Sequence, residues 1–227
     1  MTEAIPHITI DGPSGVGKGT ASLYLAKALN WHYLDSGAIY RLLAYQAQQS
    51  ACDFNDINRL VDVAQSLDVH FEITAEDRAQ TLLNGMPADQ HIRTEDCAKN
   101  ASIISKFQEV RAALVARQKA FLKAPGLIAD GRDMGTFIFP NAPLKLFLTA
   151  SAEIRAQRRY KELIAKGICV KMRDLLQDVK DRDARDQNRA VNPLKPAKDA
   201  IVIDTGDKTI AQVNQLLEQL YHEHFAS

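Results

Sequence analysis

Residues 12–20 read Gly-Pro-Ser-Gly-Val-Gly-Lys-Gly-Thr and follow the apolar run Ile5–Ile10, which is typical of a buried strand. Glycines allow backbone dihedrals and close approaches that a Cβ would forbid. Successive N–H groups can then point at a phosphate, and the helix expected next presents its positive N-terminal end to the same anion. A turn without a ligand is the alternative, but the strand–loop–helix context favours a mononucleotide-binding P-loop. The residues expected to contact the nucleotide are Gly12, Pro13, Ser14, Gly15, Val16, Gly17, Lys18, Gly19 and Thr20.

Within this loop, Lys18 supplies a mobile charge for the β- and γ-phosphates. The usual P-loop has Ser or Thr directly after the lysine, whereas here Gly19 intervenes and the hydroxyl is on Thr20. This GKGT form resembles nucleoside monophosphate kinases more than switch GTPases or motor ATPases. It leaves open whether Thr20 touches Mg²⁺ directly.

Composition limits the classes of protein that this chain can represent. Its 227 residues carry 28 basic and 28 acidic side chains, so the net charge is zero and a nucleic-acid polymer is not expected as a partner. The three cysteines, Cys52, Cys97 and Cys169, are far apart and form no CxxC pair, which is typical of reduced thiols. No signal peptide and no run of 18 apolar residues is visible, so we expect a cytoplasmic protein that does not enter a membrane.

Apolar runs and helical patterns alternate along most of the chain, which predicts an α/β fold with a doubly wound parallel sheet. The expected strands are Ile5–Ile10, His32–Leu34, Leu127–Ala129, Leu144–Leu148 and Ile201–Ile203. The expected helices are Lys18–Asn30, Gly37–Gln49, Glu109–Leu122, Ala152–Lys166, Arg173–Arg189 and Thr209–Phe225. Ligands of such sheets bind beyond the carboxyl ends of the strands.

Residues 52–105 interrupt this alternation. Alternating apolar residues in Val69–Ile73 predict a half-exposed strand, and Asn84-Gly85 predicts a hairpin turn. We therefore expect a small α+β insertion at 52–105 on the acceptor side of the site, although a subdomain without a role in binding is the alternative. The P-loop core is then formed by residues 1–51, 106–150 and 191–227, and an arginine-rich helical lid by residues 151–190.

Two further motifs follow expected strands. Asp35-Ser36-Gly37 starts a helix that carries Arg41; this is either an ordinary helix N-cap or a second anion site, which we favour beside a P-loop. Asp130-Gly131-Arg132-Asp133 follows a buried strand, where the ligand should lie. Arg132 could bind a phosphate and Asp133 could accept a hydrogen bond from a base amino group, or the two could form a structural pair.

The segment 151–190 is rich in arginine. Arg182, Asp186 and Arg189 are spaced i, i+4 and i+7, as on one face of a helix, and the preceding helix carries Arg155, Arg158 and Arg159. A solvated charged face is the usual explanation of such a run. However, guanidinium groups suit phosphates and ribose hydroxyls, so we favour a pair of helices that closes over a triphosphate.

With these motifs together, the chain resembles the bacterial cytidylate kinases over nearly its full length. The resemblance rests on GPSGVGKGT, LDSGAIYR, IADGRDMGT and the run Arg182-Asp183-Ala184-Arg185-Asp186-Gln187-Asn188-Arg189. It implies a five-stranded parallel core, an acceptor insertion and an arginine lid. It also implies transfer of the γ-phosphoryl group of ATP to CMP or dCMP, with Mg²⁺ held mainly by nucleotide phosphates and water, in a monomer.

Carried over by position, the resemblance assigns nine residues to the acceptor. Ser36, Ser102, Arg111 and Asp133 would contact the base; Arg41, Arg132 and Arg189 the phosphate; Arg182 and Asp186 the sugar. Ser102 and Arg111 rest on the resemblance alone. The catalytic charge is expected from Lys18, Arg132, Arg158 and Arg189. No metal-ligating residue is assigned.

Little covalent chemistry is then needed from the protein. The acceptor is already a phosphate oxyanion, so catalysis requires positioning and charge neutralisation but no general base. Two alternatives stay open at this stage. One is a P-loop kinase for UMP or for a non-nucleotide alcohol, and the other is a nucleotide switch, although no NKxD motif is present.

Overall fold

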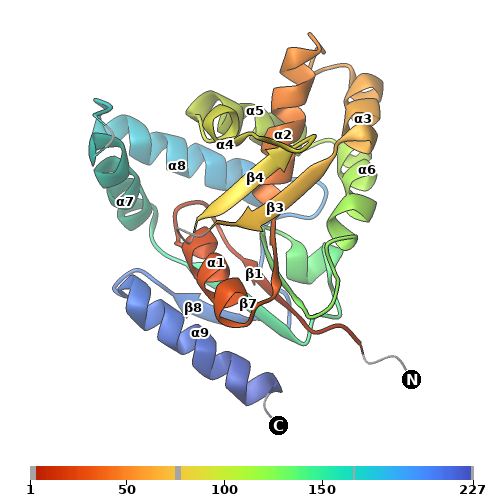
Figure 1. Ribbon diagram of the computed structural model, residues 1–227. Coiled ribbons are helices and arrows are strands. Elements are labelled where there is room, and N and C mark those ends of the chain that lie inside the picture. The colour runs from red at the N-terminus through yellow and green to blue at the C-terminus, as the bar shows by residue number, and fades with distance from the viewer. Residues whose placement is uncertain (1–3, 75–77, 166, 226–227) are drawn as a thin grey trace.

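A computed structural model of the chain describes residues 4–74, 78–165 and 167–225. The strands are β1 (His7–Asp11), β2 (His32–Asp35), β3 (Val69–Ile73), β4 (Ala79–Leu83), β5 (Met86–Pro87), β6 (Leu127–Gly131), β7 (Leu144–Thr149) and β8 (Ile201–Asp204). The helices are α1 (Lys18–Ala28), α2 (Ser36–Gln49), α3 (Ile57–Ser66), α4 (Asp89–Ile92), α5 (Glu95–Ile104), α6 (Gln108–Lys119), the π-helix η1 (Met134–Ile138), α7 (Ala152–Ala165), α8 (Met172–Gln187) and α9 (Ile210–Phe225). Figure 1 shows their arrangement.

The expected parallel sheet is confirmed, with five strands in the order β2-β6-β1-β7-β8. Each expected strand is present, and the bounds differ only at the ends. β1 begins at His7 rather than at Ile5. At its C-terminal end, each of the five strands extends at least one residue further than expected. The carboxyl ends of β1 and β6 lie side by side, because Asp11 pairs in register with Gly131. This adjacency places the P-loop beside the segment that follows β6.

Two hydrophobic cores cover the two faces of the sheet. Alternate residues of β6 enter different cores: Ile128 packs with the cluster of α1 and α9, whereas Leu127 and Ala129 pack with that of α2, α3 and α6. All three side chains are fully buried. This is the pattern expected of parallel strands with helices on both faces.

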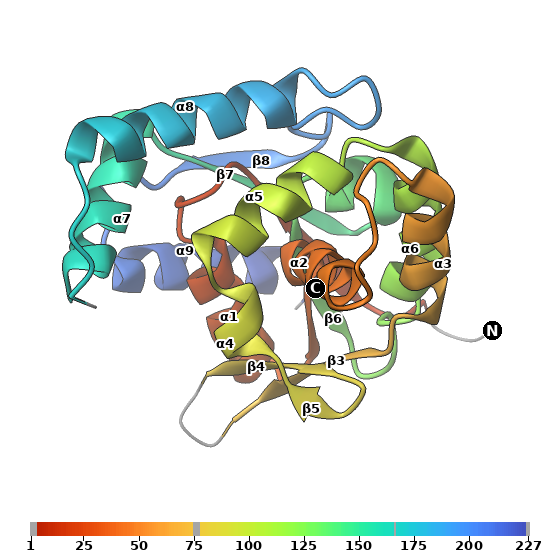
Figure 2. The same cartoon turned by 90° about the horizontal axis from the view of Figure 1, so that it is seen from above.

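Residues 52–105 build a second sheet, with the order β3-β4-β5 and antiparallel pairing. The expected strand Val69–Ile73 and the hairpin turn are both confirmed. Asn84 and Gly85 take the positive φ angles of 51° and 74° that a tight turn between β4 and β5 requires. Figure 2 shows this small sheet at one end of the molecule, away from α7 and α8.

The helices α7 and α8 pack against each other in both views (Figures 1 and 2). One expectation was wrong here: the helix ends at Gln187, with Asn188 as its C-cap, so Arg189 lies beyond α8 and not on its face. α7 matches Ala152–Lys166 except that Lys166 lies outside the described residues.

The three cysteines are all free thiols in the structure. Among the described residues, every helix is too short or too polar to cross a membrane.

Candidate active site

The P-loop leaves the carboxyl end of β1 and enters α1 with an open helix terminus. Gly17, the N-cap of α1, has φ 92° and offers no side-chain hydrogen bond, and the first turn of α1 contains no acidic residue. Gly12 has φ +147°, and a Cβ there would lie 2.1 Å from the carbonyl oxygen of Leu148. Because the first-turn N–H groups of α1 have no side-chain cap, they are available to an anionic ligand.

Lys18 is buried at the start of α1. Its Nζ donates to the carbonyl oxygen of Pro13 at 2.8 Å and lies 4.0 Å from the Asp130 carboxylate. Burial, together with the nearby charge of Arg132, lowers the pKa of Lys18 from 10.5 to about 7. Burial also raises the pKa of Asp130 to about 7. In both groups burial opposes the charged form, and ionisable pairs perturbed in this way are frequent at functional sites.

A neighbouring carboxylate, Asp11 at the end of β1, has a structural task. It accepts hydrogen bonds from the backbone N–H groups of Met134 and Gly135 at 2.9 and 2.8 Å. Burial raises its pKa to about 6. Asp11 therefore fixes the segment after β6 against the P-loop strand.

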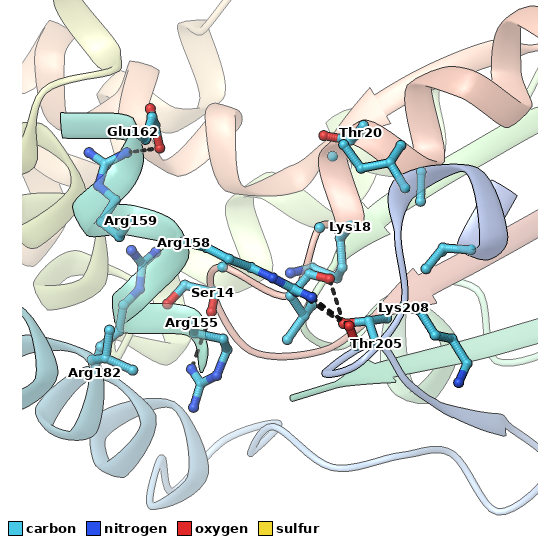
Figure 3. Close-up of a pocket in the computed structure, with 18 of the residues that line it drawn as sticks. Ser14, Lys18, Thr20, Arg155, Arg158, Arg159, Glu162, Arg182, Thr205 and Lys208 are labelled. Carbon is cyan, nitrogen blue, oxygen red and sulfur yellow. Dashed lines mark hydrogen bonds and ion pairs between the residues drawn. The ribbon is translucent and has the colours of Figure 1, made fainter. Parts of the chain in front are cut away.

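A cleft of about 930 Å³ opens over the P-loop (Figure 3). Its P-loop wall is Ser14–Ala21. Its cationic lining comes from α2, from the end of α4, from α7 and from α8, and consists of Arg41, Arg93, Arg155, Arg158, Arg159 and Arg182. The opposite wall contains Thr205, Lys208 and the first turns of α9. Glu95, Glu162 and Asp178 also line the cleft, but the six arginines, Lys18 and Lys208 outnumber them. This excess of positive charge suits a ligand that carries several negative charges.

Arg158 of α7 reaches across the cleft to the segment after β8 (Figure 3). Its guanidinium donates to the carbonyl oxygen and the hydroxyl of Thr205. The Thr205 hydroxyl in turn donates to the P-loop carbonyl of Val16 at 2.9 Å. Arg158 is thus held at the P-loop cleft, where the sequence analysis expected a catalytic charge.

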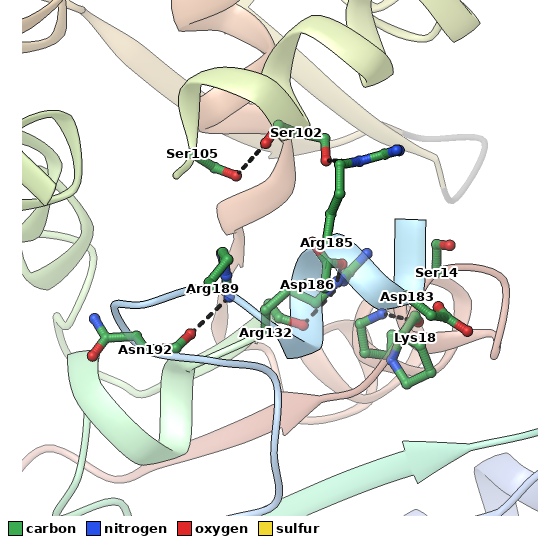
Figure 4. Close-up of polar contacts among 12 residues, drawn as sticks. Ser14, Lys18, Ser102, Ser105, Arg132, Asp183, Arg185, Asp186, Arg189 and Asn192 are labelled. Atoms are coloured by element: carbon green, nitrogen blue, oxygen red, sulfur yellow. Dashed lines mark hydrogen bonds and ion pairs between the residues drawn. The ribbon is translucent and has the colours of Figure 1, made fainter. Parts of the chain in front are cut away.

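A second polar cluster lies beside the cleft, after β6. Arg111 of α6 and Asp133 form an ion pair, and both side chains are less than 5% exposed. Arg132 donates to Asp186 of α8 at 3.0 Å, and Arg189 donates to the carbonyl oxygen of Asn192 at 2.9 Å (Figure 4). The alternative of a structural Arg132–Asp133 pair is not found in the described part of the structure. Each of these residues pairs instead with a partner distant in the sequence.

Three arginines predicted to contact the acceptor carry a buried donor without a protein partner. The Nε atoms of Arg111, Arg182 and Arg189 are buried and make no hydrogen bond to the described part of the chain. A buried unpaired donor costs about 1–3 kcal/mol. Arg111 of α6 and Arg189, which follows α8, lie in the second cluster, whereas Arg182 of α8 lines the P-loop cleft. Unpaired donors therefore favour a polar ligand in both places.

The structure divides the predicted acceptor residues between these two places. Arg41 and Arg182 line the P-loop cleft, and Arg41 also donates to the carbonyl oxygen of Ile92 at 2.8 Å. Arg111, Arg132, Asp133, Asp186 and Arg189 belong to the second cluster.

The two predicted serines are hydrogen-bonded within the protein. The hydroxyl of Ser36 donates to the side chain of Gln118 at 2.9 Å. That of Ser102 accepts from Arg185 at 3.3 Å, which connects α5 with α8.

Several cleft residues were not found by the sequence analysis. Thr205 and Lys208 follow β8, and the rule that ligands bind beyond the carboxyl ends of parallel strands was sufficient to suggest them. Neither a motif nor a position after a parallel strand points to Arg93, because it lies within residues 52–105. Its guanidinium pairs with Asp35 at 3.1 Å, so tertiary contact alone brings it to the site.

This fold and this cleft define a P-loop phosphotransferase. Comparisons with known proteins then specify the family: the family model described as cytidylate kinase matches residues 8–223. The cytidylate kinase of Colwellia psychrerythraea is 52% identical over 218 residues, covering 96% of each chain, and that of an Enterobacter species is 53% identical over 213 residues, covering 94% of this chain and 93% of that protein. A solved shikimate kinase from Bacteroides thetaiotaomicron is 12% identical, with a TM-score of 0.46 over 96% of this chain and 99% of that one. The chain belongs to the cytidylate kinase family.

Proposed function

We propose that this protein transfers the γ-phosphoryl group of ATP to CMP or dCMP, giving ADP and CDP or dCDP. Membership of the cytidylate kinase family supports the reaction. The observation that carries the site is that Arg111, Arg182 and Arg189 each keep a buried Nε donor without a hydrogen-bond partner among the described residues. A nucleoside monophosphate offers these donors a phosphate, sugar hydroxyls and a polar base edge.

In this proposal the donor occupies the P-loop cleft. The uncapped N-terminus of α1 and Lys18 bind the ATP phosphates, and Arg158 adds charge over them. Arg132 and Arg189 supply charge from the acceptor side. The phosphorus–oxygen bond to ADP breaks as a CMP phosphate oxygen bonds to the γ-phosphorus, and ADP keeps the electron pair. Positioning and charge neutralisation lower the barrier, since the acceptor oxyanion needs no base.

We assign the acceptor residues in three groups. Ser36, Ser102, Arg111 and Asp133 contact the base; Arg41, Arg132 and Arg189 contact the phosphate; Arg182 and Asp186 contact the sugar. The ion pairs Arg111–Asp133 and Arg132–Asp186 support this assignment, because they fix guanidinium groups that could otherwise rotate freely. Residues 52–105 would form the acceptor insertion, and 151–190 the lid.

Mg²⁺ enters this site with ATP, held mainly by phosphate oxygens and water. Within the described residues, no three His, Cys, Asp or Glu side chains gather as metal ligands. The Asp130 carboxylate lies beside the P-loop, 3.6 Å from the position that a Cβ on Gly19 would take, and so can accept a hydrogen bond from metal-bound water. When bound, the ion neutralises phosphate charge.

We further propose a monomer that acts in the cytoplasm on small nucleotides rather than on nucleic acid.

ADP release with ATP alone, and with CMP, dCMP, UMP, AMP or a sugar alcohol added singly, tests the reaction. We expect CMP and dCMP to give the highest kcat/KM. Lys18→Ala is the matched control: it should lower kcat by roughly 10²–10³, the usual loss for one electrostatic contact to the transition state. A higher kcat/KM for UMP or the alcohol would overturn the proposal, and ADP release with ATP alone at the full rate would indicate an ATPase.

A further inference from the structure

Arg155, in the first turn of α7, is a buried arginine for which the proposed chemistry has no use. Its side chain is 4% exposed although it is one of the residues that line the cleft. Its Nε donates to the carbonyl oxygen of Ala150 at 3.0 Å, which ties the guanidinium to the end of β7. A buried guanidinium is costly unless its donors are satisfied. The partners of the remaining donors therefore show what this residue holds together.

The first of these partners is the P-loop. Arg155 Nη1 donates to the carbonyl oxygen of Ser14 at 3.2 Å (Figure 3). The stem of the side chain packs on the same loop, since a Cβ on Gly15 would lie 3.2 Å from Arg155 Cβ. Arg155 thus connects α7 with the P-loop.

The second partner is the helix α8. Arg155 forms a two-pronged ion pair with Asp183, whose carboxylate accepts from Nη1 at 2.9 Å and also from Nη2. Asp183 is only 16% exposed. It lies between Arg182, which lines the cleft, and Asp186, which pairs with Arg132. Figure 4 shows Asp183 on the same helix as Asp186.

We propose that Arg155 and Asp183 are positioning residues that fix α8 relative to the P-loop, so that Arg182 keeps its place in the cleft that also contains Lys18. This inference rests on the proposed function for the identity of the nucleotides bound there. Its physical basis is that one planar guanidinium bonds three separate segments, which an ammonium group cannot reproduce. Small errors of placement at a phosphoryl-transfer site cost large factors in rate.

A matched control is present on the same two helices. Glu153 of α7 and Lys180 of α8 form an ion pair at 3.4 Å, but their side chains are 58% and 51% exposed. This pair connects the same elements without burial, and no described contact joins it to the P-loop. Glu153→Gln should therefore leave kcat and ATP affinity within about twofold of the wild type, as is usual for exposed pairs.

The test compares Arg155→Lys and Asp183→Asn with Glu153→Gln at a temperature where circular dichroism shows all three folded. We expect kcat with CMP to fall at least about tenfold in the first two. In addition, the double variant Asp183→Asn/Arg182→Lys should have the same kcat as the single variant Arg182→Lys. The reason is that Asp183 acts through Arg182, so its loss has no further effect once Arg182 is replaced. If the role of Asp183 is purely structural, the losses in kcat caused by the two substitutions should multiply in the double variant, or Tm should fall while kcat stays unchanged.

A second readout does not depend on the acceptor. The Kd for ATP, measured by calorimetry without CMP, should rise at least about fivefold in Arg155→Lys, since the support of Ser14 is lost. If the wild type binds ATP but does not phosphorylate CMP, the proposed function fails while this measurement still decides the inference. Should Arg155→Lys not fold, Asp183→Asn decides it by the same Kd. Values within twofold of Glu153→Gln in both kcat and Kd would overturn the inference.

Discussion

Lys18 is placed where burial opposes its charge. The lowered pKa of about 7 results chiefly from desolvation, with Arg132 adding to it. Only the protonated amine stabilises phosphate oxygens, so activity is present below this pKa and is lost as pH rises through it. We measure kcat/KM for ATP at saturating CMP as a function of pH, because this parameter reports the pKa values of the free enzyme. We expect it to decline from about pH 7 upward, on an alkaline limb of the pH profile, and not only near the usual pKa of lysine.

The matched control for this pH profile is Lys18→Arg. A guanidinium stays protonated throughout the range, so the limb should disappear even if the rate is lower. Asp130→Asn should move the limb to still lower pH, because the Asp130 charge raises the pKa of Lys18. A profile that stays flat to pH 9 in the wild type would contradict the buried, depressed lysine.

A substitution of Asp133 tests how the base is recognised. Cytosine offers an amino donor at C4, whereas uracil offers a carbonyl there, so a pure acceptor selects cytosine. Asp133→Asn should lower kcat/KM for CMP much further than for UMP, shifting their ratio by roughly tenfold or more, about 1.4 kcal/mol. Parallel assays with both nucleotides measure this ratio.

The structure adds a second effect of the same substitution. Asp133 is the ion-pair partner of buried Arg111, and breaking a buried pair destabilises a protein by about 3–5 kcal/mol. Thermal unfolding must therefore accompany the assay, and both nucleotides are compared below the lowered Tm. Equal losses for CMP and UMP would mean that Asp133 orients Arg111 and does not read the base.

At the scale of elements, the end of α8 decides how Arg189 acts. Because the helix stops at Gln187, Arg189 is held by a backbone contact to Asn192 and not by the helix face. Its Nε is buried and has no hydrogen-bond partner in residues 4–74, 78–165 and 167–225. Arg189→Lys should lower kcat with CMP by at least about tenfold at saturating ATP, since an ammonium lacks the planar fork that suits a phosphate.

The control for Arg189 is Arg185→Lys, on the exposed side of the same helix end. Within the described part of the chain, Arg185 has one hydrogen bond, at 3.3 Å to Ser102, so its replacement should change kcat by less than about threefold. Unchanged steady-state kinetics in Arg189→Lys would support the alternative of a solvated charged surface.

At the scale of the whole molecule, residues 52–105 share one interior with the five-stranded sheet. Leu60 of α3 is fully buried in the same cluster as Leu34, Leu42 and Leu127. Leu60→Ala should therefore destabilise the whole protein by about 2–5 kcal/mol. We expect one cooperative transition in chemical denaturation, although residues 52–105 have a sheet of their own.

Trp31 makes this prediction measurable. It is the single tryptophan of the chain and packs on Tyr221 and Phe225 of α9, in contact with the other core. In Leu60→Ala, the denaturation midpoints followed by Trp31 fluorescence and by far-UV circular dichroism should decrease by the same amount. A shift in circular dichroism alone would mean that the insertion unfolds independently. Val202→Ala, at a site 57% exposed on β8, should change the stability by less than about 0.5 kcal/mol.

The sequence by itself determined the local features of this protein. The five parallel strands, the P-loop and the hairpin turn at Asn84-Gly85 depend on short-range patterns: apolar runs, glycine spacing and turn residues. For the same reason the ends of elements were less well predicted. The pattern that continued to Arg189 did not show that the helix stops at Gln187, where Asn188 becomes the C-cap.

The tertiary structure alone decided the partners of the charged residues. Neighbours in the sequence, such as Arg132 and Asp133, pair with Asp186 and Arg111 instead. Arg155 contacts Ser14 and Asp183 across intervals of 141 and 28 residues. Ion pairs and hydrogen bonds act over a few ångströms, so they depend on which segments the sheet and its crossovers bring together. A linear pattern records residue type and spacing but not that proximity.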